Sequence, residues 1–271
     1  MQKLLVISDI HICQPGETII GLDPMARFRL VLDAACTAHP DAKALILLGD
    51  LTHRGLPDEY AALATVLRDV PIPIIPMLGN HDRRAAFLAA FPDAPRTGAG
   101  HVQGMMDLPR HRVITLDSLD GPPYPAGHHM GRLCPDRRAF LSAALAGARD
   151  RTALVFVHHP PFATGIAGMD AINLADGDTF LDQLAAHGAV HLFCGHVHRT
   201  MSGSSRGVPW SMFKSPCHQG VLDFESDNSS LSVDEPGAYG LLLLHEGGVI
   251  AHSEDVGLIA QTTFSDCAPK A

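Results

Sequence analysis

An aspartate and a histidine stand two positions apart, directly after the apolar run of residues 4–7. A short apolar run is typical of a buried strand, and side chains two apart on an extended chain point to the same side. The carboxylate of Asp9 and the imidazole of His11 therefore leave the strand end together, as two ligands of one metal ion would. This pattern is weak alone, because an aspartate after a strand is commonly a turn residue.

The same arrangement recurs after four further apolar runs. These runs end in Gly49-Asp50, in Gly79-Asn80-His81-Asp82, in His158-His159 and in Gly195-His196-Val197-His198. Each cluster alone has an ordinary explanation as a turn or a strand end. In an open α/β sheet, however, ligands bind outside the carboxyl ends of parallel strands, so all five clusters are expected to meet along one edge. Their joint occurrence at strand ends predicts a metal site.

The elements that position these clusters alternate along the chain. Apolar strands are expected at 4–7, 44–48, 72–77, 153–157 and 190–194, with antiparallel strands at 101–107 and 111–116. Helices are expected over 24–38, 57–68, 83–90, 135–148 and 178–187, and loops over 117–132 and 165–177. Apolar strands alternating with helices predict an α/β fold with a mainly parallel sheet that is covered on both faces.

The pattern of the sequence changes beyond Thr200, where short expected strands are separated by turns rich in Gly, Ser and Asn. We therefore expect a core over residues 1–200. Residues 201–271 are expected to form a β-rich tail that completes a second sheet and adds a small cap or association element. Such an element favours a homo-oligomer.

Composition narrows the classes of partner. The 271 residues are 46% hydrophobic, which suffices for one large domain, and they carry a net charge of −9 with only 20 Lys and Arg. An acidic chain argues against nucleic-acid and anionic membrane partners, both of which need a basic face. The six cysteines lack C-x-x-C spacing and no secretory signal precedes them, so we expect reduced thiols and a cytoplasmic protein.

Taken together, the five clusters resemble the motif set of the calcineurin-like metallophosphoesterase superfamily. The resemblance runs from about residue 3 to residue 200. The spacing, and Cys217-His218-Gln219 after the last motif, are most similar to the bacterial branch of class III cyclic-nucleotide phosphodiesterases and glycerophosphodiesterases. The resemblance implies a four-layer αββα sandwich, followed here by a C-terminal β-hairpin cap or association element.

The resemblance also implies two metal ions. The first would be held by Asp9, His11 and His198, the second by Asn80, His158 and His196, and Asp50 would bridge both. Mixed nitrogen and oxygen ligands without thiolate suit Mn, Fe, Zn or Co. The reaction implied is attack of a metal-bridging hydroxide on phosphorus.

Three further residues receive catalytic or substrate-binding roles. His81 would contact the phosphate or protonate the leaving alkoxide, and Asn80, besides binding metal, would also contact the substrate. Asp82 would orient a neighbouring imidazole, and His218 is either a further histidine on the phosphate side or an ordinary hairpin residue.

Four histidines lie outside the motif pattern. His53 is left open, and His159 is expected to be structural. His128 and His129 belong to a long loop that would be able to close over the site, but we expect them to be surface residues.

The resulting prediction is a phosphodiesterase that acts on small diesters, either cyclic nucleotides or glycerophosphodiesters. The alternatives are a phosphomonoesterase or phosphonate monoester hydrolase using the same site, and a non-catalytic binding module on the same fold. A nuclease or a protein phosphatase is disfavoured by the shortage of basic residues.

Overall fold

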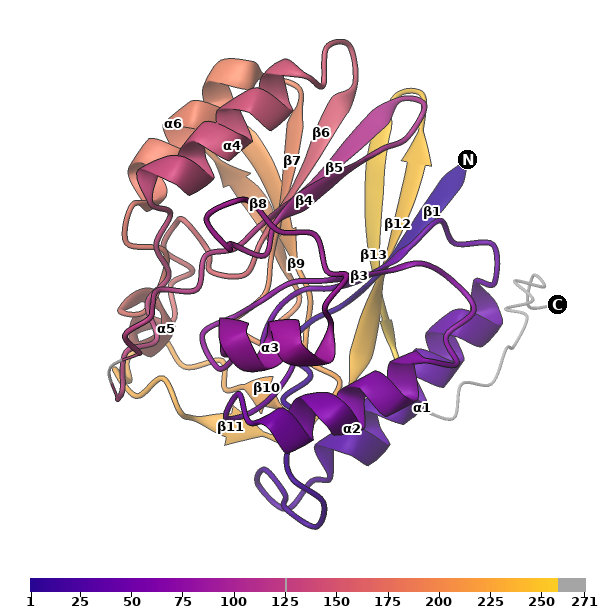
Figure 1. Cartoon of the computed structure of the whole chain (residues 1–271). Helices are drawn as coiled ribbons and strands as arrows, with labels where there is room; N and C mark the ends of the chain where they lie inside the picture. Colours follow the sequence, from indigo (N-terminus) through magenta and orange to yellow (C-terminus); the bar gives the residue numbers. More distant parts are fainter. Residues whose placement is uncertain (125, 258–271) are drawn as a thin grey trace, which may run out of the picture.

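The computed structural model describes residues 1–124 and 126–257, and shows two β-sheets packed face to face between two layers of helices (Figure 1). Helices α1 (Pro24–Ala38), α2 (Pro57–Leu67) and α3 (Arg84–Ala90) belong to one half of the molecule. Helices α4 (Pro135–Ala146) and α6 (Gly177–His187) cover the other half. The predicted four-layer αββα sandwich is confirmed.

The first sheet has the strand order β13-β12-β1-β2-β3. Strands β1 (Gln2–Ile7), β2 (Leu45–Leu47) and β3 (Ile74–Pro76) run parallel, and the hairpin of β12 (Ala238–His245) and β13 (Gly248–Asp255) joins β1 antiparallel. The carboxyl ends of these three parallel strands lie at one edge, as predicted. The sequence prediction of a single parallel sheet is wrong, however, because the expected strands at 153–157 and 190–194 belong to the second sheet.

The second sheet has the order β4-β5-β6-β7-β9-β8. Strands β5 (His111–Leu116), β6 (Thr152–Val157), β7 (Val190–Cys194) and β9 (Val208–Met212) are parallel. Strands β4 (Gly104–Asp107) and β8 (Met201–Ser205) close the two edges in antiparallel pairs.

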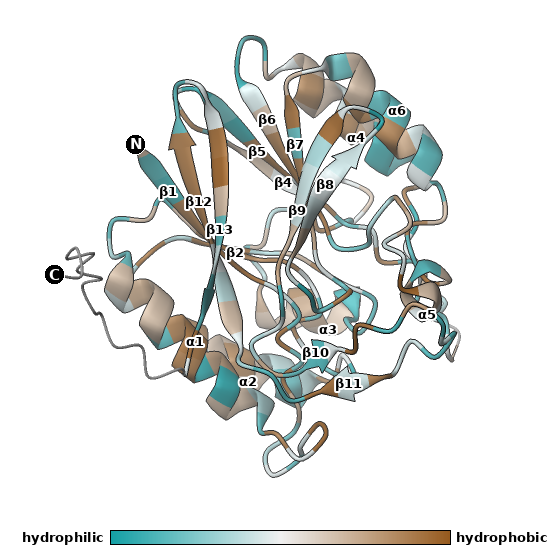
Figure 2. Ribbon diagram, turned by 180° about the vertical axis from the view of Figure 1, so that it is seen from behind, coloured by the Kyte–Doolittle hydropathy of each residue, from teal (hydrophilic) through white to brown (hydrophobic). Residues whose placement is uncertain are grey.

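Side chains of the central strands point alternately to the two faces of the sheet, so that one strand contributes to two hydrophobic cores. In β1, Leu5 and Ile7 pack toward the helices, whereas Leu4 and Val6 fill the space between the two sheets. Successive side chains on a strand point to opposite faces, so a strand covered on both sides must be apolar throughout. In Figure 2, brown segments stand beside pale and teal ones along the strands, and the covering helices also carry both colours.

Local signals fix the helix starts. The Asp23 carboxylate accepts a hydrogen bond from the backbone N–H of Ala26 at 3.1 Å, and Pro24 occupies the first position of α1, where no N–H is needed. The prediction of a loop over 165–177 is wrong in one respect, because this segment contains the short helix α5 (Ala167–Asp170). A single helical turn is too short to show periodicity in sequence.

The tail contributes to both sheets. Strands β8 and β9 extend the second sheet as predicted, but β12 and β13 extend the first sheet, so the tail does not complete the second sheet alone. Between them, β10 (Gln219–Gly220) and β11 (Ser232–Val233) form a two-stranded pair. Residues 258–271 lie outside the described part of the chain. Among the described residues, the helices are too short or too polar to cross a membrane.

Candidate metal centre and active site

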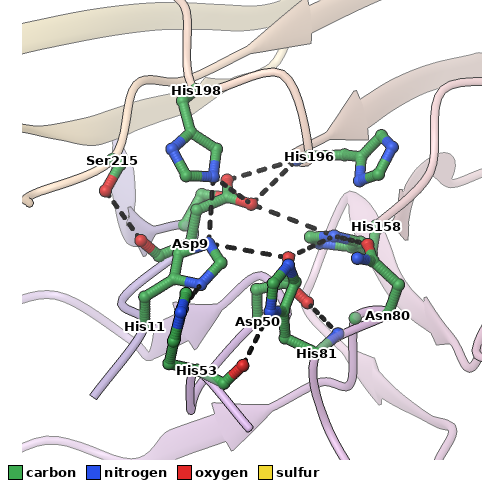
Figure 3. Close-up of polar contacts among 12 residues, drawn as sticks. Asp9, His11, Asp50, His53, Asn80, His81, His158, His196, His198 and Ser215 are labelled. Carbon is green, nitrogen blue, oxygen red and sulfur yellow. Dashed lines mark hydrogen bonds and ion pairs between the residues drawn. The ribbon is translucent and has the colours of Figure 1, made fainter. Parts of the chain in front are cut away.

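The motif residues meet where the carboxyl ends of the two sheets converge (Figure 3). The first sheet supplies Asp9 and His11 after β1, Asp50 after β2 and Asn80 after β3. The second sheet supplies His158 after β6, and His196 and His198 after β7. Backbone hydrogen bonds hold the loops in register: the N–H of Asp9 donates to the carbonyl of Gly49, and that of His11 to the carbonyl of Asp50.

The ligand atoms are separated by distances that suit one coordination sphere. Metal bonds of about 2.0–2.2 Å place neighbouring ligand atoms of one ion roughly 3.0–3.6 Å apart. The Nε2 atoms of His11 and His198 are 3.0 Å apart, and His198 Nε2 lies 3.5 Å from Asp9 Oδ1.

A second group of ligand atoms lies beside the first. His158 Nε2 is 3.3 Å from Asn80 Oδ1. His196 is buried nearby, and its Nε2 atom has no hydrogen-bond partner among the described residues. An unpaired buried nitrogen next to a cluster of donors is the state expected of a metal ligand.

Asp50 connects the two groups through a single oxygen. Its Oδ2 atom lies 3.6 Å from His11 Nε2 and 3.3 Å from His158 Nε2. Its other oxygen, Oδ1, accepts the backbone N–H of His81 at 2.8 Å. Asp50 is thus the residue placed to serve both groups, with one oxygen rather than two.

Backbone carbonyls fix which ring nitrogen faces the cluster. His158 donates its Nδ1–H to the carbonyl of Leu48 at 3.0 Å, and His198 donates its Nδ1–H to the carbonyl of His218, also at 3.0 Å. Each ring therefore turns its Nε2 lone pair toward the carboxylates. Such outer contacts orient imidazoles for metal binding.

The backbone around the cluster is strained. Eight described residues other than glycine have positive φ angles, and five of them are predicted ligands: Asp9, His11, Asp50, His196 and His198. This region is costly for residues with a Cβ, and such strain concentrates at functional sites. The packing is equally tight, since a Cβ on Gly79 would lie 2.2 Å from Asp50 Oδ1.

The charges of the cluster call for a cation. Burial raises the pKa of Asp9 to about 7, and the neighbouring Asp50 carboxylate adds to this shift. Burial also disfavours the charge of Asp50, but His158, His81 and His11 together outweigh burial and hold the pKa of Asp50 well below its usual range. Burial lowers the pKa of His158, yet Asp50, Asp9 and the carbonyl of Leu48 together more than reverse this and raise the value to about 9.

The other imidazoles of the cluster stay neutral. Burial lowers the pKa values of His11 and His196 well below the usual range, and that of His198 to about 4. Neutral imidazoles and buried carboxylates are the ligand forms that a metal requires. The residues present therefore fit two metal ions, which would replace the proton on His158 as the compensating charge.

Comparison with known proteins identifies the family. The family model described as calcineurin-like phosphoesterase matches residues 2–200. This chain is a member of that family. Calcineurin-like phosphoesterases use a two-metal centre, and the clusters described above are its candidate ligands.

Curated relatives of this calcineurin-like phosphoesterase are named as phosphodiesterases. A probable cyclic nucleotide phosphodiesterase of Rhodopseudomonas palustris is 38% identical over 252 residues, covering 92% of this chain and 91% of the relative. The glycerophosphodiester phosphodiesterase GpdQ of Enterobacter lignolyticus is 30% identical over 218 residues, covering 79% and 77%. A dimetal phosphatase from Danio rerio has the same fold, with a TM-score of 0.70 at 15% identity over 94% of this chain and 96% of that one.

His81 and His218 lie on the open side of the metal ligands. Both line a cavity of about 290 Å³ that contains the cluster. His81 donates its Nδ1–H to the carbonyl of His53 at 2.7 Å. His218 is buried, burial lowers its pKa to about 3, and its Nδ1 has no hydrogen-bond partner in the described part of the chain.

The prediction that Asp82 orients an imidazole is wrong. Its carboxylate accepts hydrogen bonds from the backbone N–H groups of Leu51, Thr52 and Gly79, and from the Tyr60 hydroxyl at 2.8 Å. Asp82 therefore links the loops after β2 and β3, and its bonds to the backbone next to Asp50 and Asn80 fix the positions of these two residues. The sequence shows only that Asp82 follows a histidine. It does not show that backbone N–H groups from two loops surround the carboxylate.

His53 and His129, which sequence reasoning left open or assigned to the surface, both line the cavity. His53 Nδ1 lies 3.5 Å from His11 Nδ1, and the ring of His53 stacks with that of His81. His159 is structural, as expected, because both of its ring nitrogens are hydrogen-bonded away from the cluster. The only signal for His129 in the sequence was the unusual number of histidines, 17.

The tail also reaches the site through a residue that the motifs do not include. The hydroxyl of Ser215 donates to the carbonyl of Asp9 at 2.7 Å and accepts the N–H of Cys217 at 2.9 Å. These bonds fix the segment that carries His218 against the end of β1, and Figure 3 shows the bond from Ser215 to Asp9.

Proposed function

We propose that the chain is a metal-dependent phosphodiesterase that hydrolyses small phosphodiesters. The observation that carries this proposal is the convergence of seven candidate ligands from both sheets, five of which line one cavity. The names of the relatives, cyclic nucleotide and glycerophosphodiester phosphodiesterases, support the reaction class.

Two ions would be held in the proposed centre. Asp9, His11 and His198 would hold one, Asn80, His158 and His196 the other, and Asp50 Oδ2 would be shared. Mn, Fe, Zn and Co all suit these nitrogen and oxygen ligands. When bound, such a pair of ions lowers the pKa of water and stabilises the charge of the phosphoryl oxygens.

Besides holding the metal ions, the chain would orient the substrate and donate a proton to the leaving group. Because His81 donates its Nδ1–H to the carbonyl of His53, its Nε2 atom is the one available to a substrate. Protonated there, His81 would donate to the leaving alkoxide oxygen as a general acid. His218, from the tail, would contact the phosphate on the same side.

The cavity wall favours a substrate with a single negative charge. Among the described residues that line it, none is a lysine or arginine. The wall instead offers the apolar side chains Ile20, Ile172 and Leu231 and the hydroxyls of Ser230 and Ser232. A phosphodiester with an uncharged, partly apolar leaving group matches such a wall better than a polyanion.

The substrate class is tested by comparing kcat/KM of the Mn-loaded chain for 3′,5′-cAMP and glycerophosphocholine, with bis(p-nitrophenyl) phosphate as an activated control. We expect hydrolysis of the control, and a preference of about a hundredfold for one natural diester would identify the class, equivalent to about 2.7 kcal/mol. Absence of any diester hydrolysis in a chain with metals bound would refute the proposal.

The location and assembly of the chain are also proposals. The five described cysteines are free thiols, which supports the cytoplasm as the working compartment. The division into a core over 1–200 and a tail, and a homo-oligomer that forms through the tail, stay predictions.

A further inference from the structure

The loop that follows β5 is fixed against the site by His159. The Nε2 atom of His159 faces a backbone carbonyl, which can only accept, so the ring proton sits on Nε2 and the Ser118 hydroxyl donates to Nδ1 at 2.7 Å. His159 Nε2–H then donates to the backbone carbonyl of His129 at 3.1 Å. His159 is fully buried, and the backbone of Gly131 passes so close that a Cβ there would lie 2.4 Å from the imidazole ring. The backbone at His129 therefore has a defined position.

The side chain of His129 meets one of the proposed metal ligands. The distance from His129 Nδ1 to Asn80 Nδ2 is 2.9 Å, and the Oδ1 atom of the same amide lies 3.3 Å from His158 Nε2. An amide nitrogen can only donate, so His129 Nδ1 is the acceptor. This single bond decides which end of the Asn80 amide faces the cluster, because a flipped amide would direct its N–H₂ group at the metal position.

The ring of His129 also has a packed position. It stacks with His81 at a centroid distance of 5.3 Å and an interplanar angle of 29°. Stacking and the bond from His159 to the backbone together leave the Nδ1 atom aimed at Asn80. A residue that holds a ligand in this way affects metal affinity without touching the ion.

We propose that His129 is a positioning residue, which holds the oxygen of the Asn80 amide toward the second metal ion by accepting the hydrogen bond of the amide nitrogen. This inference rests on the proposed function, in which Asn80 is a ligand. It gives the loop after β5 a part in the metal site.

The inference is tested with two variants and one control. His129→Phe keeps a stacked ring but removes the acceptor, whereas His129→Asn places an amide oxygen close to the position of Nδ1. His128→Phe is the matched control, because the neighbouring ring bonds Asp120 at 2.9 Å instead of Asn80. Metal-stripped chains are titrated with Mn²⁺, and the dissociation constant of the second ion and kcat/KM for bis(p-nitrophenyl) phosphate are measured.

We expect His129→Phe to weaken binding of the second ion by about tenfold to a hundredfold, and to lower kcat/KM in parallel. His129→Asn should stay within about threefold of the wild type, and His128→Phe should be unchanged. If His129→Phe binds the second ion as the wild type does, the inference is overturned. Equal losses in the Phe and Asn variants would overturn it too, since they would show that loop packing and not the hydrogen bond matters. A wild type that holds fewer than two ions would instead refute the proposed function, and with it the premise of this inference.

Discussion

Gly79→Ala is the substitution whose effect follows most directly from the packing of the site. A Cβ at this position would lie 2.2 Å from Asp50 Oδ1, 2.6 Å from the backbone nitrogen of Asp50 and 2.7 Å from His158 Nε2. None of these atoms is the free end of a flexible side chain. The loop must therefore move, and the shared carboxylate and a histidine of the second group move with it.

These short distances determine how much activity Gly79→Ala should lose. Overpacking of a close-packed site costs about 1–3 kcal/mol, and a misplacement of about 1 Å near reacting groups can cost about a hundredfold in rate. We expect Gly79→Ala to lower kcat/KM for bis(p-nitrophenyl) phosphate by about tenfold to a hundredfold. The number of Mn ions retained after gel filtration should fall below that of the wild type.

Gly98→Ala is the matched control, because no atom lies within 4 Å of a Cβ placed there. Its activity and metal content should equal those of the wild type, and thermal unfolding would show that both variants are folded. A Gly79→Ala variant with wild-type activity and metal content would refute the reasoning that the ligands are packed against this backbone.

Three further predictions concern single residues. Asp50→Ala should remove both ions and turnover together, because Asp50 Oδ2 lies within 3.6 Å of a histidine of each group, and metal analysis showing two retained ions would contradict this. His81→Ala should keep the metal content but lower kcat most for alkyl diesters, and an equal loss for aryl and alkyl diesters would exclude a proton-donor role. Burial lowers the pKa of His191 to about 4, so the folded chain binds fewer protons than the unfolded chain between that pH and about 6.5. Stability should therefore fall as the pH drops through this window, and His191→Gln, which can keep the contact with Ser211, should flatten the dependence measured by urea unfolding; identical slopes would refute it.

Much of the fold was predictable because its strands are covered on both faces. Runs such as those of β1 and β6 are apolar at every position, and this pattern is specific to central strands between layers. The partner of β12 was not predictable. The sequence pattern of a half-buried hairpin is the same whichever sheet the hairpin extends. In the structure the hairpin pairs with the edge of the first sheet, beside β1.

The candidate ligands were predictable for a related reason. Each lies within four residues of the end of a strand, so the position of the strand end determines the position of the side chain. His129 lies in a loop without periodicity, and its place depends on a bond from His159, which is 30 residues away in sequence. Asp82 was misjudged because its role depends on three backbone N–H groups, which the sequence does not display.

The central claim, a two-metal phosphodiesterase, is tested most directly by titrating the metal-stripped chain with Mn²⁺ while following both bound metal and hydrolysis of bis(p-nitrophenyl) phosphate. We expect two ions to bind per chain, and the activity to rise as the second ion binds. Full hydrolysis by the stripped chain, or saturation with a single ion at full activity, would contradict it.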